Sequence, residues 1–213
     1  MDGNNRWSKI NGKNKYQSYT KGANNLLQLS NEIFLKTKVN NITAFALSAN
    51  NLKRPKSIIN SILKILDLNL DRALEKDINF SISIRGDLRF LDSEIKKKIQ
   101  LLEQKKIDNN KKLIILLNYS GRQDIIDTSL KIINSKKKIN LENFEANSIL
   151  SGLSDPDLLI RTGGYQRISD FLLFNISFTE LFFTKKLWPD LSYSDVLKII
   201  NKFNNIERKF GIW

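Results

Sequence analysis

Short apolar runs alternate with amphipathic segments along the chain, and this alternation predicts most of its secondary structure. Apolar runs bounded by polar residues or glycine are typical of buried strands, and they occur at Ile42–Leu47, Asn79–Ile84, Leu113–Leu117 and Leu158–Ile160. Apolar residues three and four positions apart predict helices, and they occur at Ala23–Lys36, Ser57–Glu75, Ser93–Lys105, Gly121–Ile133 and Ser194–Phe210.

The order of these segments predicts the architecture. Strands that alternate with helices form a mainly parallel central sheet flanked by helices, an α/β fold, and we expect residues 1–213 to form a single domain. Two stretches have weaker patterns: Asp108–Asn110 predicts a turn, and Lys136–Leu153 predicts a basic loop followed by a short helical stretch. Polar residues that follow successive strands should meet at one edge of the sheet.

The absence of two residue types limits the chemistry. The 213 residues include no cysteine and no histidine, which excludes disulfides, thiolate nucleophiles and histidine acid–base catalysis. Any metal ion must therefore be held by oxygen ligands, and oxygen ligands favour a hard ion such as Mg²⁺.

A formal net charge of +13 leaves several kinds of anionic partner open. Nucleic acid, anionic lipid and polyphosphate substrates all fit this charge, as does a solvated lysine-rich surface. Lysines outnumber arginines 26 to 9 and often occur in runs. Arginine, whose planar fork grips phosphate in pairs, lies in polar motifs instead, at Arg6, Arg54, Arg122, Arg161 and Arg167.

The stretch Ser154–Leu191 carries the strongest functional pattern. Its apolar strand ends in Arg161-Thr162-Gly163-Gly164, and Arg167 and Ser169 follow. Glycines allow a sharp turn and a close approach to a ligand, while arginines and a hydroxyl suit a diphosphate. Four further polar blocks are Asp2–Trp7, Ser48–Pro55, Arg85–Asp87 and Asn118–Arg122. Taken singly, the first two are more typical of an ordinary turn than of a functional site.

Together, the five blocks resemble the cis-prenyltransferases, the undecaprenyl diphosphate synthase or isoprenyl transferase family. The resemblance implies a cis-prenyltransferase-like fold and a Mg²⁺-dependent enzyme. It implies condensation of isopentenyl diphosphate onto an allylic diphosphate, which gives a Z-polyprenyl diphosphate of the kind used for undecaprenyl lipid carriers. The absence of an Asp-Asp pair argues against the aspartate-rich trans class.

The resemblance also implies roles for individual residues. Asp2 and Asn51 are expected to be catalytic, and Asp2 and Glu180 are expected to bind Mg²⁺. Arg161, Arg167 and Ser169 are expected to bind isopentenyl diphosphate. The allylic side and its surroundings are assigned to Gly3, Asn4, Arg6, Trp7, Lys15, Ser48 and Arg54, although packing is the stronger interpretation for Trp7. The matching helix in the family, here Ser57–Glu75, lines a tunnel for the growing chain, and its apolar stripe fits a tunnel and a core equally well.

Several positions depart from the family pattern. The family usually has histidine at or beside Tyr19, arginine at Lys15, and glutamate at Asn50 and Tyr165. These losses weaken the allylic side and leave a second hypothesis open, that of a non-catalytic or low-activity partner subunit.

The surroundings of the protein are also predicted from the resemblance. A homodimer is implied by the family. No signal peptide or membrane span is apparent, so we expect a cytoplasmic protein. We also expect that it binds no nucleic acid, and peripheral membrane contact through a lipid product stays open. In the family a short apolar strand precedes the Asp-Gly-Asn block, and this chain lacks it before Met1. We therefore expect that the natural protein carries further residues ahead of Met1, with a chain that has truly lost the strand as the alternative.

Overall fold

The structure is a computed structural model that describes residues 1–105, 107 and 110–211. Its helices are α1 (Asn4–Ile10), α2 (Lys15–Lys36), α3 (Lys56–Glu75), α4 (Ser93–Gln104), α5 (Gly121–Asn134), α6 (Leu141–Asn147) and α7 (Tyr193–Asn204). Its strands are β1 (Asn41–Ser48), β2 (Ser81–Gly86), β3 (Lys112–Tyr119), β4 (Leu158–Arg161) and β5 (Glu180–Phe183). The expected α/β fold is confirmed.

All strand pairings in the described residues are parallel, but they form two sheets. The larger sheet has the order β1-β3-β2, and the smaller sheet pairs β4 with β5. No ladder joins the two sheets within the described residues, whereas the sequence predicted one central sheet. A strand ahead of Asp2 stays a prediction.

Strand β3 is the centre of the fold because both of its faces are covered. Leu113 and Leu117 belong to one apolar cluster, and Ile114 and Leu116 belong to another. Successive side chains of a strand point to opposite faces, so β3 separates two cores. Because both faces are buried, the sequence of such a parallel strand is a continuous apolar run.

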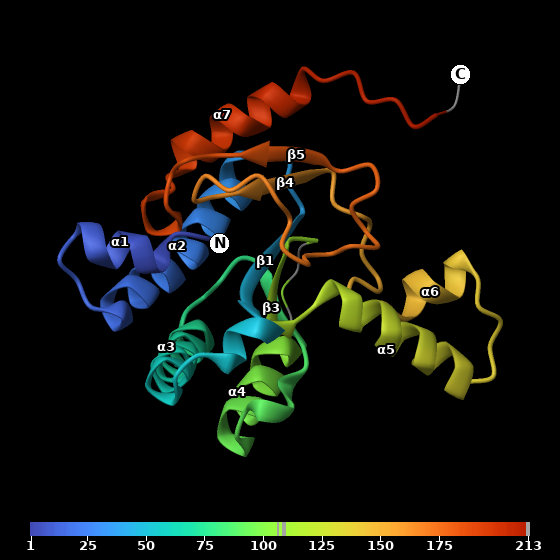
Figure 1. Ribbon diagram of the computed structural model, residues 1–213, viewed down its shortest axis with the longest axis horizontal. Helices are drawn as coiled ribbons and strands as arrows, with labels where there is room; N and C mark the ends of the chain where they lie inside the picture. Colours follow the sequence, from blue (N-terminus) through green and yellow to red (C-terminus); the bar gives the residue numbers. More distant parts are fainter. Residues whose placement is uncertain (106, 108–109, 212–213) are drawn as a thin grey trace.

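Helices cover the larger sheet as Figure 1 shows. Helices α2, α3 and α4 pack on one face, where the first core extends to Trp188 and to Val196 of α7. Helices α5 and α6 form a pair that lies on the side of the sheet away from α1 and α2. None of the described helices combines the length and hydropathy needed to cross a membrane.

The sequence placed most elements correctly and misjudged several ends. Helix α2 begins at Lys15, not Ala23, because Asn14 and Gln17 form reciprocal cap hydrogen bonds of 2.9 and 3.0 Å. Helix α7 ends at Asn204, before the expected Phe210. Strand β5 was not predicted, and residues 108 and 109 of the expected turn lie outside the described residues.

The burial of β3 generates a stability prediction. Leu113 is 0% exposed, and replacing it by alanine should lower the free energy of unfolding by about 2–5 kcal/mol. Leu101, which is 47% exposed on α4, provides the control, and Leu101→Ala should change the free energy much less. Urea denaturation of both variants measures the difference, and equal losses would contradict this account of the core.

Candidate functional site

The start of the chain is held against the end of β4. The backbone N–H of Asp2 donates to Thr162 Oγ1 at 2.8 Å, and that hydroxyl donates to the Asp2 carbonyl at 2.9 Å. The same carbonyl accepts a hydrogen bond from the Trp188 N–H at 2.9 Å. Thr162 is only 2% exposed, so these contacts are sheltered from water. They place the Asp2 side chain beside the Arg161-Thr162-Gly163-Gly164 turn.

The Arg161 guanidinium is the best-fixed cation of the site. Its Nη2 donates to Asp2 Oδ2 at 3.1 Å, and its Nη1 donates to Ser169 Oγ at 2.7 Å and to the Arg167 carbonyl. The side chain is 13% exposed, and its buried Nε has no partner in the described residues. An arginine held in this way is pre-oriented for an anionic ligand.

The turn after β4 requires a glycine at position 163. Its φ of +86° belongs to the left-handed region, and a Cβ there would lie 2.5 Å from Arg6 Nη2. Arg6 Nη2 instead donates to the Gly163 carbonyl at 2.6 Å and lies 3.8 Å from Asp2 Oδ1. The glycine therefore lets Arg6 and Arg161 approach the same carboxylate.

Three guanidinium groups surround one aromatic ring at this site. The guanidinium carbons of Arg6, Arg161 and Arg167 lie 5.2, 5.7 and 4.3 Å from the centre of the Tyr165 ring. These distances are within the range of cation–π attraction. Sequence analysis named Tyr165 only as a departure from the family pattern, because its contacts with the three arginines join residues from separate segments.

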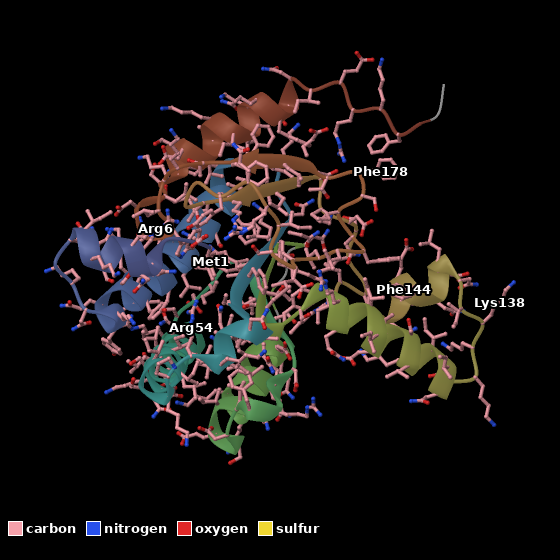
Figure 2. All side chains as sticks on the ribbon, viewed as in Figure 1. Met1, Arg6, Arg54, Lys138, Phe144 and Phe178 are labelled. Atoms are coloured by element: carbon pink, nitrogen blue, oxygen red, sulfur yellow. The ribbon has the colours of Figure 1, made fainter. Side chains whose placement is uncertain are left out.

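A cavity of about 420 Å³ opens beside these groups. Figure 2 shows Met1, Arg6 and Arg54 on one side of the molecule, and all three line the cavity. The interior is apolar and is formed mainly by α2, α3, β2 and β3. Its apolar walls include Leu26, Leu27, Ile62, Ile65, Leu66, Leu70, Ile82, Ile84, Ile115 and Leu117. Asp2 is the only acidic residue among the described lining residues.

Helix α3 contributes to both the apolar core and the wall of the cavity. Leu70 and Ala73 belong to the core cluster, and they line the cavity together with the buried Ile65. The apolar stripe of α3 is broad enough to contact the neighbouring helix and still leave side chains facing the open space.

The remaining predicted residues divide into those at the cavity and those away from it. Gly3, Asn4, Asn51 and Arg54 line the cavity, and Arg54 Nη1 donates to the Tyr19 hydroxyl at 3.1 Å. Ser48, Lys15 and Trp7 are not among the lining residues. Lys15 is exposed at the first position of α2.

Trp7 is buried next to the site and does not line the cavity. It is 8% exposed, and its Nε1 donates to Asp190 Oδ1 at 2.8 Å. Burial opposes ionisation of Asp190, but hydrogen bonds from Lys21 and Trp7 more than offset it and lower the pKa of this carboxyl. A charged Asp190 thus anchors α1 to the turn after β5, which agrees with the packing interpretation of Trp7.

Glu180 and the arginine that contacts Asp2 lie at opposite ends of the β4–β5 ladder, and the expected Mg²⁺ role of Glu180 stays a prediction. Glu180 opens β5 and pairs with Leu158, whereas Arg161, the partner of Asp2, pairs with Phe183 at the other end of the ladder. Three residue steps along a strand span about 10 Å. The described residues also contain no group of three or more acidic side chains able to hold a metal ion. Within the chain, Asp2 is therefore the metal-ligand candidate at the cavity.

Other predicted blocks meet as expected at the ends of the strands. Asn118 Nδ2 donates to the Asp87 carbonyl at 3.0 Å, which joins the segments after β2 and β3. Ser120 Oγ donates to Asp170 Oδ2 at 2.6 Å, which joins the start of α5 to the loop after β4. These contacts connect the carboxyl ends of β2 and β3 with the loop after β4.

Sequence analysis named Thr162, Tyr19 and Tyr165 but did not assign any of them to the site. Thr162 lies inside the Arg-Thr-Gly-Gly pattern, and its buried position after a strand was the available signal. Tyr19 lies on α2, and its position one turn from Ala23 was hidden because the helix was expected to begin later.

Comparison with known proteins gives consistent matches over nearly the whole chain. The family model described as putative undecaprenyl diphosphate synthase matches residues 1–211. An isoprenyl transferase of Campylobacter jejuni is 36% identical over 214 residues, which cover 99% of this chain and 95% of that protein. An isoprenyl transferase of Thermotoga maritima is 37% identical over 222 residues, which cover 99% and 94%.

Solved structures agree with these matches. A crystal structure of a probable undecaprenyl diphosphate synthase from Campylobacter jejuni has a TM-score of 0.80 at 34% identity and covers 90% of this chain and 92% of its own. Lavandulyl diphosphate synthase from Lavandula x intermedia, in complex with dimethylallyl diphosphate, has a TM-score of 0.87 at 27% identity and covers 100% and 95%. The chain therefore belongs to the undecaprenyl diphosphate synthase family of prenyltransferases.

Proposed function

We propose that this prenyltransferase condenses isopentenyl diphosphate onto an allylic diphosphate and makes a Z-polyprenyl diphosphate of the undecaprenyl type. The observation that carries the proposal is the cavity, which joins a cationic mouth to an apolar interior. Arg6 and Arg54 lie at the mouth, and the side chains of α3 form much of the interior. An allylic diphosphate has this same division between a charged head and an apolar tail.

A related structure supports the choice of ligand. The solved structure of lavandulyl diphosphate synthase is a complex with dimethylallyl diphosphate, an allylic diphosphate, and its similarity covers the whole of this chain. We assign the allylic head group to Gly3, Asn4, Arg6 and Arg54, and isopentenyl diphosphate to Arg161, Arg167 and Ser169.

During the reaction, the residues of the site stabilise developing negative charge and exclude water. As the allylic carbon–oxygen bond breaks, its electron pair leaves with the diphosphate, and nearby guanidinium groups stabilise the added charge. The double bond of the isopentenyl unit forms the new carbon–carbon bond, and that unit then loses a proton. Apolar walls from α3 keep water from the electron-poor allylic carbon. We place Ser48 and Asn51 as polar groups near the reacting centre.

Asp2 fits the chemistry of a Mg²⁺ ion that arrives with the diphosphate. Mg²⁺ is commonly bound by one or two carboxylates together with substrate phosphates and water, and Asp2 is the acid at the cavity. When bound, the ion neutralises negative charge on the leaving diphosphate. Arg161 and Arg6 hold the Asp2 carboxylate ready at 3.1 and 3.8 Å.

The retained groups favour an enzyme over a non-catalytic partner subunit. An accessory subunit has no need of an acid and arginines at a common anion site, and here Arg6 and Arg161 both lie within 4 Å of the Asp2 carboxylate. We further propose a cytoplasmic homodimer with peripheral membrane contact through its lipid product, on the strength of the family resemblance.

The assignment of Asp2 can be tested by a conservative change. Asp2→Asn keeps the size of the side chain and removes its charge, so incorporation of radiolabelled isopentenyl diphosphate should fall by about 10²-fold or more. Glu180→Gln removes the second expected Mg²⁺ ligand, which lies at the opposite end of the β4–β5 ladder from Arg161. We expect this variant to weaken the response to Mg²⁺ and to lower turnover less than Asp2→Asn does. Normal turnover of Asp2→Asn would exclude the proposed role.

The division between the two diphosphate sites gives a second prediction. Arg161→Lys keeps the charge but loses the fork that reaches Asp2 and Ser169. Steady-state kinetics should show a larger increase in KM for isopentenyl diphosphate than for the allylic substrate. Arg54→Lys, at the Tyr19 contact, should show the opposite preference. If the two variants exchange these effects, the two sites are assigned the wrong way round.

The cavity should set the length of the product. Leu66 lines the cavity, and Leu66→Trp would fill part of its volume of about 420 Å³. We expect shorter polyprenyl products by thin-layer chromatography. Leu68→Trp is the matched control, because Leu68 lies on the same helix, is 40% exposed and is not a lining residue. The same shift in both variants, or in neither, would argue against growth of the chain along α3.

A further inference from the structure

Tyr165 contacts the arginines of the site without neutralising them. Its ring lies within 6 Å of the guanidinium groups of Arg6, Arg161 and Arg167. A carboxylate in the same place would also attract these groups, but it would cancel one positive charge and compete with a diphosphate. An aromatic ring attracts cations through its quadrupole. The ring accepts no hydrogen bond at an oxygen, so the N–H donors of the guanidinium groups stay available to a ligand.

The three arginines differ in what else holds them. Arg161 has the Asp2 carboxylate and the Ser169 hydroxyl as partners, and Arg6 has the Gly163 carbonyl. The guanidinium of Arg167 lies 4.3 Å from the centre of the Tyr165 ring and has no hydrogen bond or ion pair within the described residues. Arg167 is therefore the cation whose position depends most on the ring.

We propose that Tyr165 is a positioning residue that holds Arg167 beside Arg161 and Arg6, so that the diphosphate site is assembled before a ligand arrives. Like charges at short range repel one another, and a long arginine side chain loses rotamer freedom when it binds. The ring reduces both costs because it keeps Arg167 near its bound position. The inference rests on the proposed function for the identity of the substrate, but it concerns the binding of any diphosphate.

Binding of inorganic pyrophosphate tests the inference without requiring turnover. Isothermal titration calorimetry at fixed ionic strength should give a dissociation constant about fivefold higher for Tyr165→Leu, while Tyr165→Phe stays within about twofold. Tyr165→Gln, a second variant without the ring, should match Tyr165→Leu. Because Tyr165 is 45% exposed, we expect all three variants to fold, and thermal unfolding checks this.

A double-mutant cycle identifies the partner of the ring. In an Arg167→Ala background, Tyr165→Leu should add less than about a twofold loss of pyrophosphate affinity, because the group that it positions is gone. With isopentenyl diphosphate as substrate, Tyr165→Leu should raise KM and leave kcat nearly unchanged. Rescue by Tyr165→Phe separates the ring from the hydroxyl.

Each outcome supports or overturns the inference. Equal affinity of Tyr165→Leu and the unchanged protein would overturn it, as would a full loss that persists in the Arg167→Ala background. A loss in Tyr165→Phe as large as that in Tyr165→Leu would assign the effect to the hydroxyl and also overturn it. If the pyrophosphate pattern holds but no isopentenyl diphosphate is incorporated, the proposed function fails and the positioning role stands.

Discussion

The short contact between Asp2, Thr162 and Trp188 is the constraint on which the site depends. The hydrogen bonds of Asp2 with Thr162 join residues separated by 160 positions in the chain. They use the backbone of Asp2, so its carboxylate stays available for Arg161. A site that must place an acid to within a fraction of an ångström needs this kind of support from outside its reactive groups. Without it, Arg161 would lose its carboxylate partner and the cavity would lose its acid.

Parallel strands then determine which other groups reach this point. Loops that follow β2 and β3 meet because the carboxyl ends of parallel strands lie at one edge of the larger sheet. The contact Asn118–Asp87 joins them, and Ser120–Asp170 connects the start of α5 to the loop after β4. That loop also carries Ser169, which accepts a hydrogen bond from Arg161. The anion site is consequently a property of the sheet as well as of the arginines.

Sequence prediction succeeded for features that depend on a single segment of the chain and failed for features that depend on contacts between segments. Strand β3 and helix α3 were recognisable because burial imposes a period on each segment by itself. Strand β5 was missed because Glu180–Phe183 is short and half-exposed, and it becomes a strand by pairing with β4. The same reasoning applies to the site. Residues within the Arg-Thr-Gly-Gly turn were identified, whereas the position of Glu180 relative to Asp2 depends on the register of the β4–β5 ladder.

In the protein without ligand, the charged mouth and the apolar interior each carry an unfavourable contribution to the free energy. Beside the mouth, Arg6, Arg161 and Arg167 lie around the Tyr165 ring, and Asp2 pairs with Arg6 and Arg161 alone, so the repulsion between the three cations is only partly compensated. In the interior, the side chains of α3 face open space and lack the packing contacts of a filled core. A ligand that filled only one region would relieve only one of these costs. A molecule with a diphosphate head and an apolar tail relieves both at once. The mouth and the interior therefore behave energetically as parts of one site, although different elements of the fold build them.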